Sequence, residues 1–515
     1  MRILFLYPRM QVYLAIDNMP PIAVLSLASY MKREGHEVYI YDRGIEEKKG
    51  VLQVIEDFDP DVAVCTLMFA QQIADMQTTC RELRSSRPEL PILCGGLTAS
   101  LMPELILREG LADYVGIGEG EYTLLELLEV VGGQREPYSV QSLVYLDPNG
   151  QPVHTPLRPF ADLSDFPDTD FSLLPMQQYF TYFPEAPHTL AVCASKGCPS
   201  QCTFCFNPTY HRCQYRARKR EAVLREIESL VSEYGADGIV FIDELWGLDK
   251  EELRGYCNDI VALSEKLQKP IRWSCETRIG VLGFEDLKLM ADTGCWMIAF
   301  GIESGSPEIL KRIKKGYPLT RVETDIRNCK AVGIGVMVNA IFGFPGETSA
   351  QIKQTVHTIF RLNPTIFSAG PFYASPGSAE YNGLVAAGRL EPIGGLEGWS
   401  SLGERYFLTT NYSAVPDREL KVIHYFFYWR MLFQNRKDQK TGRLDYLKIL
   451  FRRIIDNIGR KGSFRFVFKY FHLFLYVAWH YCAYPGIRKK YNLYARNFGR
   501  KDWDDLGHLE TEGRM

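Results

Sequence analysis

The chain has 515 residues, of which 46% are hydrophobic and 23% charged, and its formal net charge is −3. This composition excludes a disordered or fibrous chain, and the length predicts about three domains of roughly 100–200 residues each. No apolar stretch reaches the ~18 residues that a membrane-spanning helix needs, and the first residues do not form a secretion signal. We therefore expect a cytoplasmic protein whose 13 cysteines stay reduced, which directs attention to metal binding.

Residues 1–134 alternate short β-rich runs with helical patterns. This alternation predicts a doubly wound, Rossmann-like parallel sheet, in which a ligand lies beyond the carboxyl ends of the strands. Glycines at those ends let the backbone approach a bulky ligand, although each loop alone is more simply a tight turn. The expected strands are 3–7, 37–41, 62–66, 91–94 and 114–117, and the residues at their ends are Pro8, Thr66, Leu67, Gly95, Gly96, Leu97, Gly118, Glu119, Gly120 and Glu121.

The middle of the chain predicts a linker and a second α/β domain. Residues 135–185 are rich in Pro, Asp and Gly, which indicates a hairpin followed by an extended linker. From 186 to 385 six strand-and-helix units predict a (β/α)6 partial barrel, whose chemistry is expected at the carboxyl ends of its strands. The expected strands are 189–194, 238–243, 271–275, 296–302, 335–342 and 365–372, with helices at 220–234, 250–266 and 349–362.

The loop after the first of these strands contains SKGCPSQCTFCFNP, which brings Cys198, Cys202 and Cys205 close together. Three close cysteines without a fourth ligand leave a [4Fe–4S] cluster with one iron open to a substrate. The alternative is a structural zinc knuckle completed by His211 or Cys213, although zinc sites usually combine two close pairs of ligands.

The C-x3-C-x2-C spacing, with the aromatic Phe204 directly before the third cysteine, resembles the signature of the radical S-adenosylmethionine superfamily. The resemblance implies that S-adenosylmethionine binds the open iron and is cleaved reductively to methionine and a 5′-deoxyadenosyl radical. It also implies cofactor contacts at later strand ends, with Arg278 pairing with the methionyl carboxylate. The other expected contacts are Gly301, Glu303, Ser304 and Gly305 in GIESGS, and Gly343 and Pro345 in IFGFPGET. Asp243 and Glu244, after the second strand, either face the substrate or cap the next helix.

A doubly wound domain directly before such a barrel resembles the cobalamin-binding radical S-adenosylmethionine enzymes. The resemblance covers residues 1 to about 385, and it implies that the strand-end residues of the first domain bind cobalamin. Corrinoid domains with a cobalt-ligating histidine carry D-x-H-x-x-G after the first strand, whereas this chain has YPRMQ at 7–11. The lower face of the corrin is therefore expected to lack a histidine ligand. A domain that has lost cobalamin is the alternative.

Residues 386–515 predict a mainly helical domain that is basic and rich in aromatic residues. Between Arg418 and Lys501 there are 20 Lys and Arg against 4 Asp and Glu, together with 21 aromatic residues. Such a segment suits the surface of a membrane or a lipid-like substrate. Ordinary helical packing with a basic outer face and stacking on single-stranded RNA are the alternatives. We expect contact with a membrane surface and no nucleic acid.

Together these features predict an anaerobic, cobalamin-dependent radical enzyme. The resemblance implies methyl transfer to an unactivated carbon, and we expect a small hydrophobic substrate and an electron donor such as flavodoxin or ferredoxin. Oxidative ring closure, as in the anaerobic magnesium-protoporphyrin monomethyl ester cyclase, is the catalytic alternative. A non-catalytic iron–sulfur or corrinoid sensor is the alternative from another class.

Overall fold

The computed structural model describes residues 1–9, 19–46, 49–68, 72–183, 185–399, 410–433, 479 and 482–494. The chain divides into two compact units, one formed by residues 1–243 and 374–405 and the other by residues 244–373 and 406–515. This division differs from the predicted domains, because both the barrel residues 186–385 and the C-terminal region 386–515 are shared between the units. The aromatic run at 464–478 lies outside the described residues.

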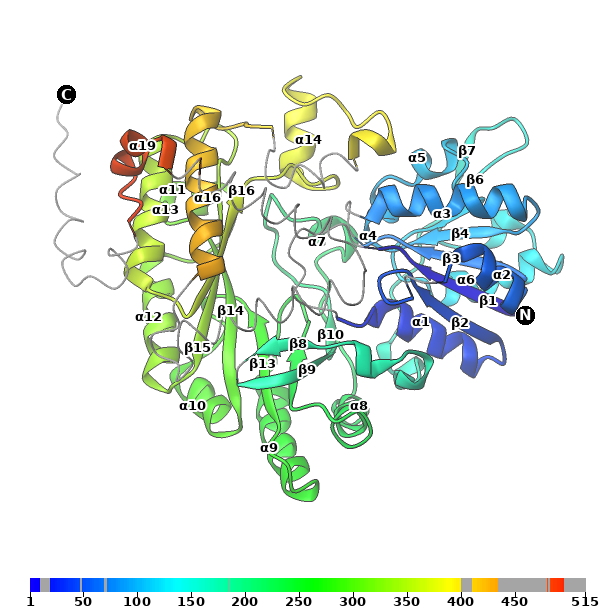
Figure 1. Cartoon of the computed structure of the whole chain (residues 1–515), viewed down its shortest axis with the longest axis horizontal. Helices are drawn as coiled ribbons and strands as arrows, with labels where there is room; N and C mark the ends of the chain where they lie inside the picture. Colours follow the sequence, from blue (N-terminus) through cyan, green and yellow to red (C-terminus); the bar gives the residue numbers. More distant parts are fainter. Residues whose placement is uncertain are drawn as a thin grey trace. The chain divides into compact units, whose positions relative to one another are not determined.

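The first unit contains a seven-stranded sheet in the order β2-β1-β3-β4-β5-β6-β7 (Figure 1). Strands β1 to β5 are parallel, and β6 and β7 add an antiparallel hairpin. The predicted doubly wound sheet is confirmed, and the predicted hairpin extends it. The strands are β1 (Arg2–Tyr7), β2 (Glu37–Asp42), β3 (Val62–Thr66), β4 (Ile92–Gly95), β5 (Tyr114–Gly116), β6 (Leu143–Leu146) and β7 (Pro152–His154). The helices are α1 (Ile22–Arg33), α2 (Val51–Phe58), α3 (Ile73–Ser86), α4 (Leu97–Leu101), α5 (Pro103–Arg108) and α6 (Glu121–Val131).

The same unit holds the first part of the second α/β domain. Strand β12 (Gly238–Phe241) pairs parallel with β9 (Ala186–Val192), which pairs antiparallel with β8 (Thr181–Phe183). A two-stranded ribbon, β10 (Ser195–Lys196) with β11 (Arg216–Ala217), lies between β9 and α8 (Arg220–Ser232) in the sequence. Two further helices of this unit are α7 (Asn207–Tyr210) and α14 (Ala379–Ala386).

The second unit contains the remaining four parallel strands, in the order β16-β15-β14-β13. With β9 and β12 they make up the six predicted strands, and β15, α9 and α13 begin and end at the predicted residues. The strands are β13 (Arg272–Thr277), β14 (Cys295–Glu303), β15 (Gly335–Phe342) and β16 (Ile366–Pro371). The helices are α9 (Lys250–Lys266), α10 (Phe284–Asp292), α11 (Pro307–Arg312), α12 (Leu319–Ala331), α13 (Ser349–Leu362), α16 (Asp417–Phe433) and α19 (Pro485–Lys490).

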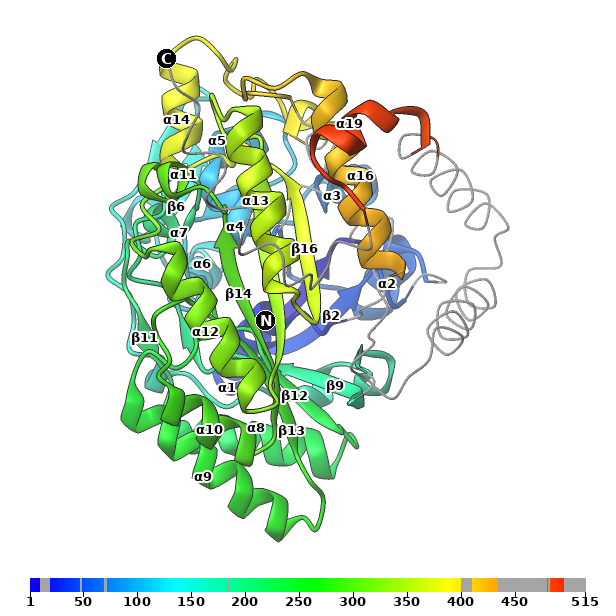
Figure 2. The same ribbon diagram turned by 90° about the vertical axis from the view of Figure 1, so that its left-hand side faces the viewer.

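The four strands of the second unit have two chemically different faces. Helices α12 and α13 pack against β15, which lies between the strands β14 and β16 labelled in Figure 2. Every second residue of β15, from Val336 to Phe342, is buried. The residues between them are only half-buried, because they point to the opposite face. Glu276, Ala299, Met337 and Ile366 lie side by side on this second face. It is the face on which a barrel of this kind presents side chains to its interior.

Within the described residues, no helix combines the length and the apolar character that crossing a bilayer requires.

Candidate functional site

The three predicted cluster ligands lie on one loop between β10 and α7. The backbone N–H of Cys205 donates to the Cys202 carbonyl at 3.2 Å, which closes a tight turn. Asn207, which is 5% exposed, connects the two ends of the loop. Its Oδ1 accepts from the Cys198 N–H at 3.3 Å, and its own N–H donates to Cys205 Sγ at 3.4 Å. N–H donors to sulfur favour the thiolate that iron requires, so Asn207 both shapes the loop and prepares a ligand.

The ribbon that precedes the cysteine loop requires a glycine at position 197. Gly197 has a φ of +84°, and a Cβ at this position would lie 2.1 Å from the Gln214 carbonyl oxygen. A side chain at Gly197 would therefore push the two halves of the ribbon apart.

Two cations of the ribbon stand opposite each other, since Lys196 pairs with Arg216 across β10 and β11. The loop after β5 supplies two acids to them. Arg216 holds both carboxylate oxygens of Glu119, one of them at 3.0 Å, and Lys196 Nζ lies 3.3 Å from Glu121 Oε1. Burial alone would raise the pKa of Glu119, but Lys196 and Arg216 outweigh it and lower that pKa. Both acids, which the sequence predicted as cobalamin contacts, thus place their carboxylates on cations beside the cysteine loop.

The two residues proposed as a fourth zinc ligand have other contacts. The Cys213 thiol donates to the Ser200 carbonyl at 3.8 Å, and the His211 ring packs edge-on against Tyr210 with centroids 4.8 Å apart. Among the described residues, no three His, Cys, Asp or Glu side chains surround one point closely enough to bind a single metal ion. A cubane does not require such a point, because its thiolates bind different irons.

Asp243 takes neither of the two roles considered for it. It is 2% exposed and accepts hydrogen bonds from the Ser195 hydroxyl and from the Ala194 N–H, the latter at 3.1 Å. It therefore fastens the start of the cysteine loop to the end of β12. The next helix, α9, is capped by Asp249 instead.

The strand ends of the first sheet differ in how open they are. Among the described residues, a Cβ at Gly95 or at Gly118 would meet no atom within 4 Å, so this part of the chain leaves open space beside both glycines. Gly96 has a φ of +94° and lies so close to Leu67 that a Cβ would be 2.7 Å from its carbonyl oxygen. Leu67 and Pro8 are buried. The two glycine-rich ends therefore fit a bulky flat ligand better than the ends of β1 and β3 do.

The first domain itself contributes no histidine to this open edge. His36 is the only histidine among residues 1–134, and it precedes β2, at the opposite end of the strands. The donor set thus fits a corrin whose lower face has no histidine ligand.

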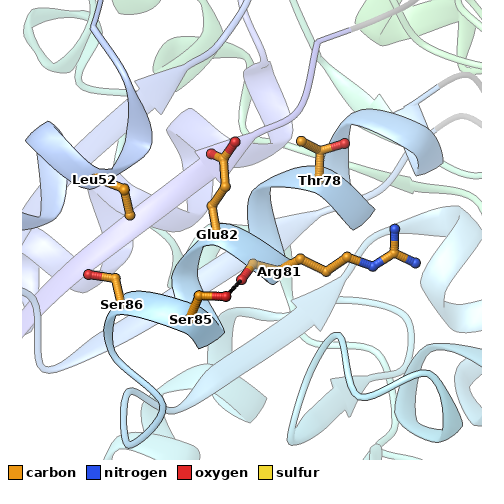
Figure 3. Close-up of a pocket in the computed structure, with 6 residues that line it drawn as sticks. All are labelled: Leu52, Thr78, Arg81, Glu82, Ser85 and Ser86. Atoms are coloured by element: carbon orange, nitrogen blue, oxygen red, sulfur yellow. Dashed lines mark hydrogen bonds between the residues drawn. The ribbon is translucent and has the colours of Figure 1, made fainter.

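The surface pocket drawn in Figure 3 is a separate feature. Its lining includes Thr78, Arg81, Glu82 and Ser85 of α3 and Leu52 of α2. The carboxyl end of β3 lies before the start of α3, so this pocket does not belong to the strand-end site.

In the second unit, Glu303 ends β14 in a strained conformation with a φ of +58°. A register shift between Gly301 and Glu303 accompanies it, and such bulges redirect side chains next to functional sites. The Glu303 carboxylate pairs with Lys315 at 3.0 Å. A Cβ at Gly301 would lie 2.4 Å from Glu303 Oε1, so this glycine makes room for the ion pair.

Arg278 follows β13 and is held beside this pair. Its Nη2 donates to the Lys315 carbonyl oxygen, and its guanidinium lies 5.7 Å from the centre of the Tyr317 ring. The Tyr317 hydroxyl donates in turn to the Gly301 carbonyl at 2.8 Å. The predicted contacts Arg278, Gly301 and Glu303 are thus brought together at adjacent strand ends.

Ser304 and Gly305 are placed differently. Ser304 is fully buried, with its hydroxyl 3.1 Å from that of Thr355 on α13, and the Gly305 N–H donates to the same hydroxyl at 3.0 Å. A Cβ at Gly305 would lie 2.4 Å from the Gln354 carbonyl oxygen. Packing against α13 therefore accounts for both residues, and their contact with S-adenosylmethionine stays a prediction.

Glu276 is a carboxyl group that the sequence analysis did not single out. Its side chain is accessible to solvent, yet the protein around it raises its pKa to about 7. Desolvation is the main cause, Glu303 and Glu244 add to it, and Lys315 opposes it.

The comparisons with known proteins agree with this geometry. A B12 binding domain model matches residues 16–128, and a radical SAM superfamily model matches residues 192–359. An uncharacterized methyltransferase of Pyrococcus horikoshii is 30% identical over 348 residues, which are 67% of this chain and 74% of the relative. The chain belongs to the cobalamin-binding radical S-adenosylmethionine enzymes. Its cofactors are therefore cobalamin, a [4Fe–4S] cluster and S-adenosylmethionine.

Two further relatives of this radical S-adenosylmethionine enzyme are informative. An anaerobic magnesium-protoporphyrin IX monomethyl ester cyclase of Rubrivivax gelatinosus is 26% identical over matched residues that make up 71% of this chain and 66% of the relative. The structure of the radical S-adenosylmethionine methyltransferase TsrM from Kitasatospora setae, with cobalamin and a [4Fe–4S] cluster bound, has a TM-score of 0.62 and 21% identity, covering 75% of each chain. At this identity the structural likeness supports the fold alone.

The loop after β15 of the enzyme contains a buried acid beside the predicted contacts Gly343 and Pro345. Glu347 is 0% exposed, and its Oε2 accepts from the N–H groups of Gly343 and Phe344, the latter at 3.0 Å. Its Oε1 has no hydrogen-bond partner among the described residues. Burial raises the pKa of Glu347 to about 7, although the two N–H donors and Arg312 oppose the rise.

Replacing Glu347 with Gln is expected to stabilise the enzyme at pH 8 but not at pH 5. In the folded state Glu347 keeps its proton up to about pH 7, whereas in the unfolded state it ionises near 4.5. Stability therefore falls as the pH rises through this window, by up to about 3 kcal/mol. Gln keeps the acceptor oxygen and does not ionise. Melting midpoints at the two pH values test this, and an equal shift at both would contradict it.

Proposed function

We propose that this enzyme is a cobalamin-dependent methylase that transfers a methyl group to an unactivated carbon of a small, largely apolar substrate. The observation that carries the proposal is the ion pairing between the ribbon that precedes the cysteine loop and the segment 118–121 that follows β5, within one compact unit. These pairs hold the ribbon next to the cysteine loop against the glycine-rich edge that suits a corrin. The relatedness to a methyltransferase supports the reaction class.

The chain supplies three sets of residues for its cofactors. When bound, the cluster, S-adenosylmethionine and cobalamin together supply radical cleavage and a transferable methyl group. The cluster would be held by Cys198, Cys202 and Cys205. S-Adenosylmethionine would contact Phe204, Arg278, Gly301, Glu303, Ser304, Gly305, Gly343 and Pro345. Cobalamin would contact the strand-end residues Pro8, Thr66, Leu67, Gly95, Gly96, Leu97, Gly118, Glu119, Gly120 and Glu121.

The open face of β13 to β16 supports an apolar substrate with a few polar groups. Its partly buried positions include Ala299, Met337, Ile341 and Ile366, which offer apolar surface to a bound molecule. Three polar side chains interrupt this surface, namely Glu276, Asn339 and Ser368. Sites of this kind bind by apolar contact and orient their ligand through a few polar groups.

Product analysis distinguishes the candidate reactions. The reconstituted enzyme, with hydroxocobalamin, dithionite, CD3-labelled S-adenosylmethionine and a lipid extract as substrate pool, is expected to form S-adenosylhomocysteine and 5′-deoxyadenosine together. A CD3-labelled lipid product should accompany them. A cyclase would form no S-adenosylhomocysteine. A sensor would bind cobalamin without cleaving S-adenosylmethionine, and either outcome would contradict the proposal.

The proposal extends to the location of the enzyme and to its partners. We infer anaerobic work in the cytoplasm, electron supply by a flavodoxin or ferredoxin, no nucleic-acid partner, and peripheral contact with a membrane through the C-terminal region. The 20 Lys and Arg between Arg418 and Lys501 support the last point, since each contributes about 1 kcal/mol near an anionic surface. Salt-sensitive sedimentation with anionic vesicles is the expected result.

A further inference from the structure

The ribbon that starts the cysteine loop is electrostatically incomplete without the first domain. Lys196 and Arg216 are direct cross-strand neighbours, and like charges in that position repel each other. The ribbon has only two residues in each strand, so few backbone hydrogen bonds oppose the repulsion.

Glu119 and Glu121 compensate these charges in a partly buried setting. The side chains of Glu119 and Arg216 are 12% and 16% exposed, and that of Glu121 is 6% exposed. Removing one partner of a buried pair leaves an uncompensated charge, which costs far more than the loss of a surface pair.

The loop that carries these acids also carries the open glycine of the proposed cobalamin site. The Gly118 carbonyl accepts from the Tyr210 hydroxyl of α7 at 3.2 Å. The Gly118 N–H donates at 2.9 Å to the hydroxyl of Ser100 on α4, the helix that follows Gly95 and Gly96. One short segment, residues 118–121, thus contacts both the glycine-rich edge of the sheet and the segment that surrounds the cluster ligands.

We propose that Glu119 and Glu121 are positioning residues that couple the binding of cobalamin to the order of the cysteine loop. This inference rests on the proposed function for the location of cobalamin. A corrin over Gly95 and Gly118 would restrict the segment 118–121, and the ordered acids would hold Lys196 and Arg216 in the paired ribbon. Coupling of this kind is reciprocal. If bound cobalamin strengthens cluster binding by some factor, an assembled cluster must tighten cobalamin binding by that same factor.

The test compares the dissociation constant of hydroxocobalamin for cluster-free and cluster-loaded full-length protein, measured by equilibrium dialysis. In the wild type we expect cluster loading to tighten binding by about 5-fold or more. In Glu119→Gln, which keeps the shape and an acceptor oxygen, this ratio is expected to approach one. An equal ratio in the variant and the wild type, or a ratio of one in the wild type, would overturn the coupling.

Asp113→Asn is the matched control, because it makes the same chemical change at the other end of β5. Asp113 pairs with Arg84 at 2.7 Å and accepts from the Ile92 N–H at 2.8 Å. It has no part in the ribbon contacts given above. This variant is expected to keep the wild-type ratio, even if it lowers the affinity for cobalamin in both forms of the protein.

Hydrogen exchange provides a readout that needs no cobalamin. Peptides covering residues 212–217 should exchange faster in Glu119→Gln than in the wild type, and at the wild-type rate in Asp113→Asn. Unchanged exchange in Glu119→Gln would overturn the positioning role. If the wild type binds no cobalamin, the proposed function and the coupling both fail, while the exchange experiment still decides whether the two acids position the ribbon.

Discussion

Replacing Cys198, Cys202 or Cys205 with Ala is expected to abolish the brown absorbance of the reconstituted enzyme and all formation of 5′-deoxyadenosine. Each thiolate would hold a different iron, so the loss of one would leave two irons of the cubane without a protein ligand. Iron and sulfide analysis, the visible spectrum and chromatography of the reaction products measure the effect.

Cys213→Ala is the control for this prediction. Cys213 lies in the segment between α7 and β11, and its thiol donates only a long hydrogen bond of 3.8 Å to the Ser200 carbonyl. Its replacement should leave the cluster and the cleavage activity intact. Loss of the cluster in Cys213→Ala would revive a fourth-ligand role for this residue, and activity retained in any of the other three variants would contradict the assignment of the ligands.

Most of the fold could be predicted because it depends on local patterns. The continuous apolar runs of buried strands and the periodicity of the helices extend over five to seventeen neighbouring residues, and they located β15, α9 and α13 without error. The cysteine spacing is local in the same sense. The strand β3 also matches its predicted range, whereas the other strands differ from theirs by one to three residues at one end or both, since strand length depends on pairing with other strands.

The charge pairs of the site could not be predicted, because they join distant parts of the sequence. Glu119 and Arg216 are 97 positions apart. Lys315 stands in the run KRIKKG, which is typical of a solvated helix end, and nothing local in the sequence indicates its ion pair with Glu303. Asn207 has no sequence signal beyond its place two residues after Cys205. The role of Asp243 depends on the neighbouring strand β9, so the sequence left its two alternatives open.

Changing Gly197 to Ala is expected to prevent cluster assembly, while changing Gly235 to Ala should not. Both glycines have positive φ angles, +84° and +72°, so an alanine at either costs about 1–2 kcal/mol in backbone strain. Only Gly197 adds a collision, because its Cβ would lie 2.1 Å from the Gln214 carbonyl, whereas a Cβ at Gly235 meets no atom within 4 Å.

Iron content and melting midpoints of the two variants distinguish the effect of backbone strain, which both share, from that of the steric collision at Gly197. Gly235→Ala should melt slightly earlier than the wild type and load a full cluster. Gly197→Ala should fold its two units and yet contain little iron, because the ribbon that carries Lys196 and Arg216 cannot close beside the first cysteine. Equal iron loading in both variants would mean that the ribbon is not needed for the cluster. Glu119 and Glu121 could then not influence the cysteines either, because the proposed coupling acts through the ribbon.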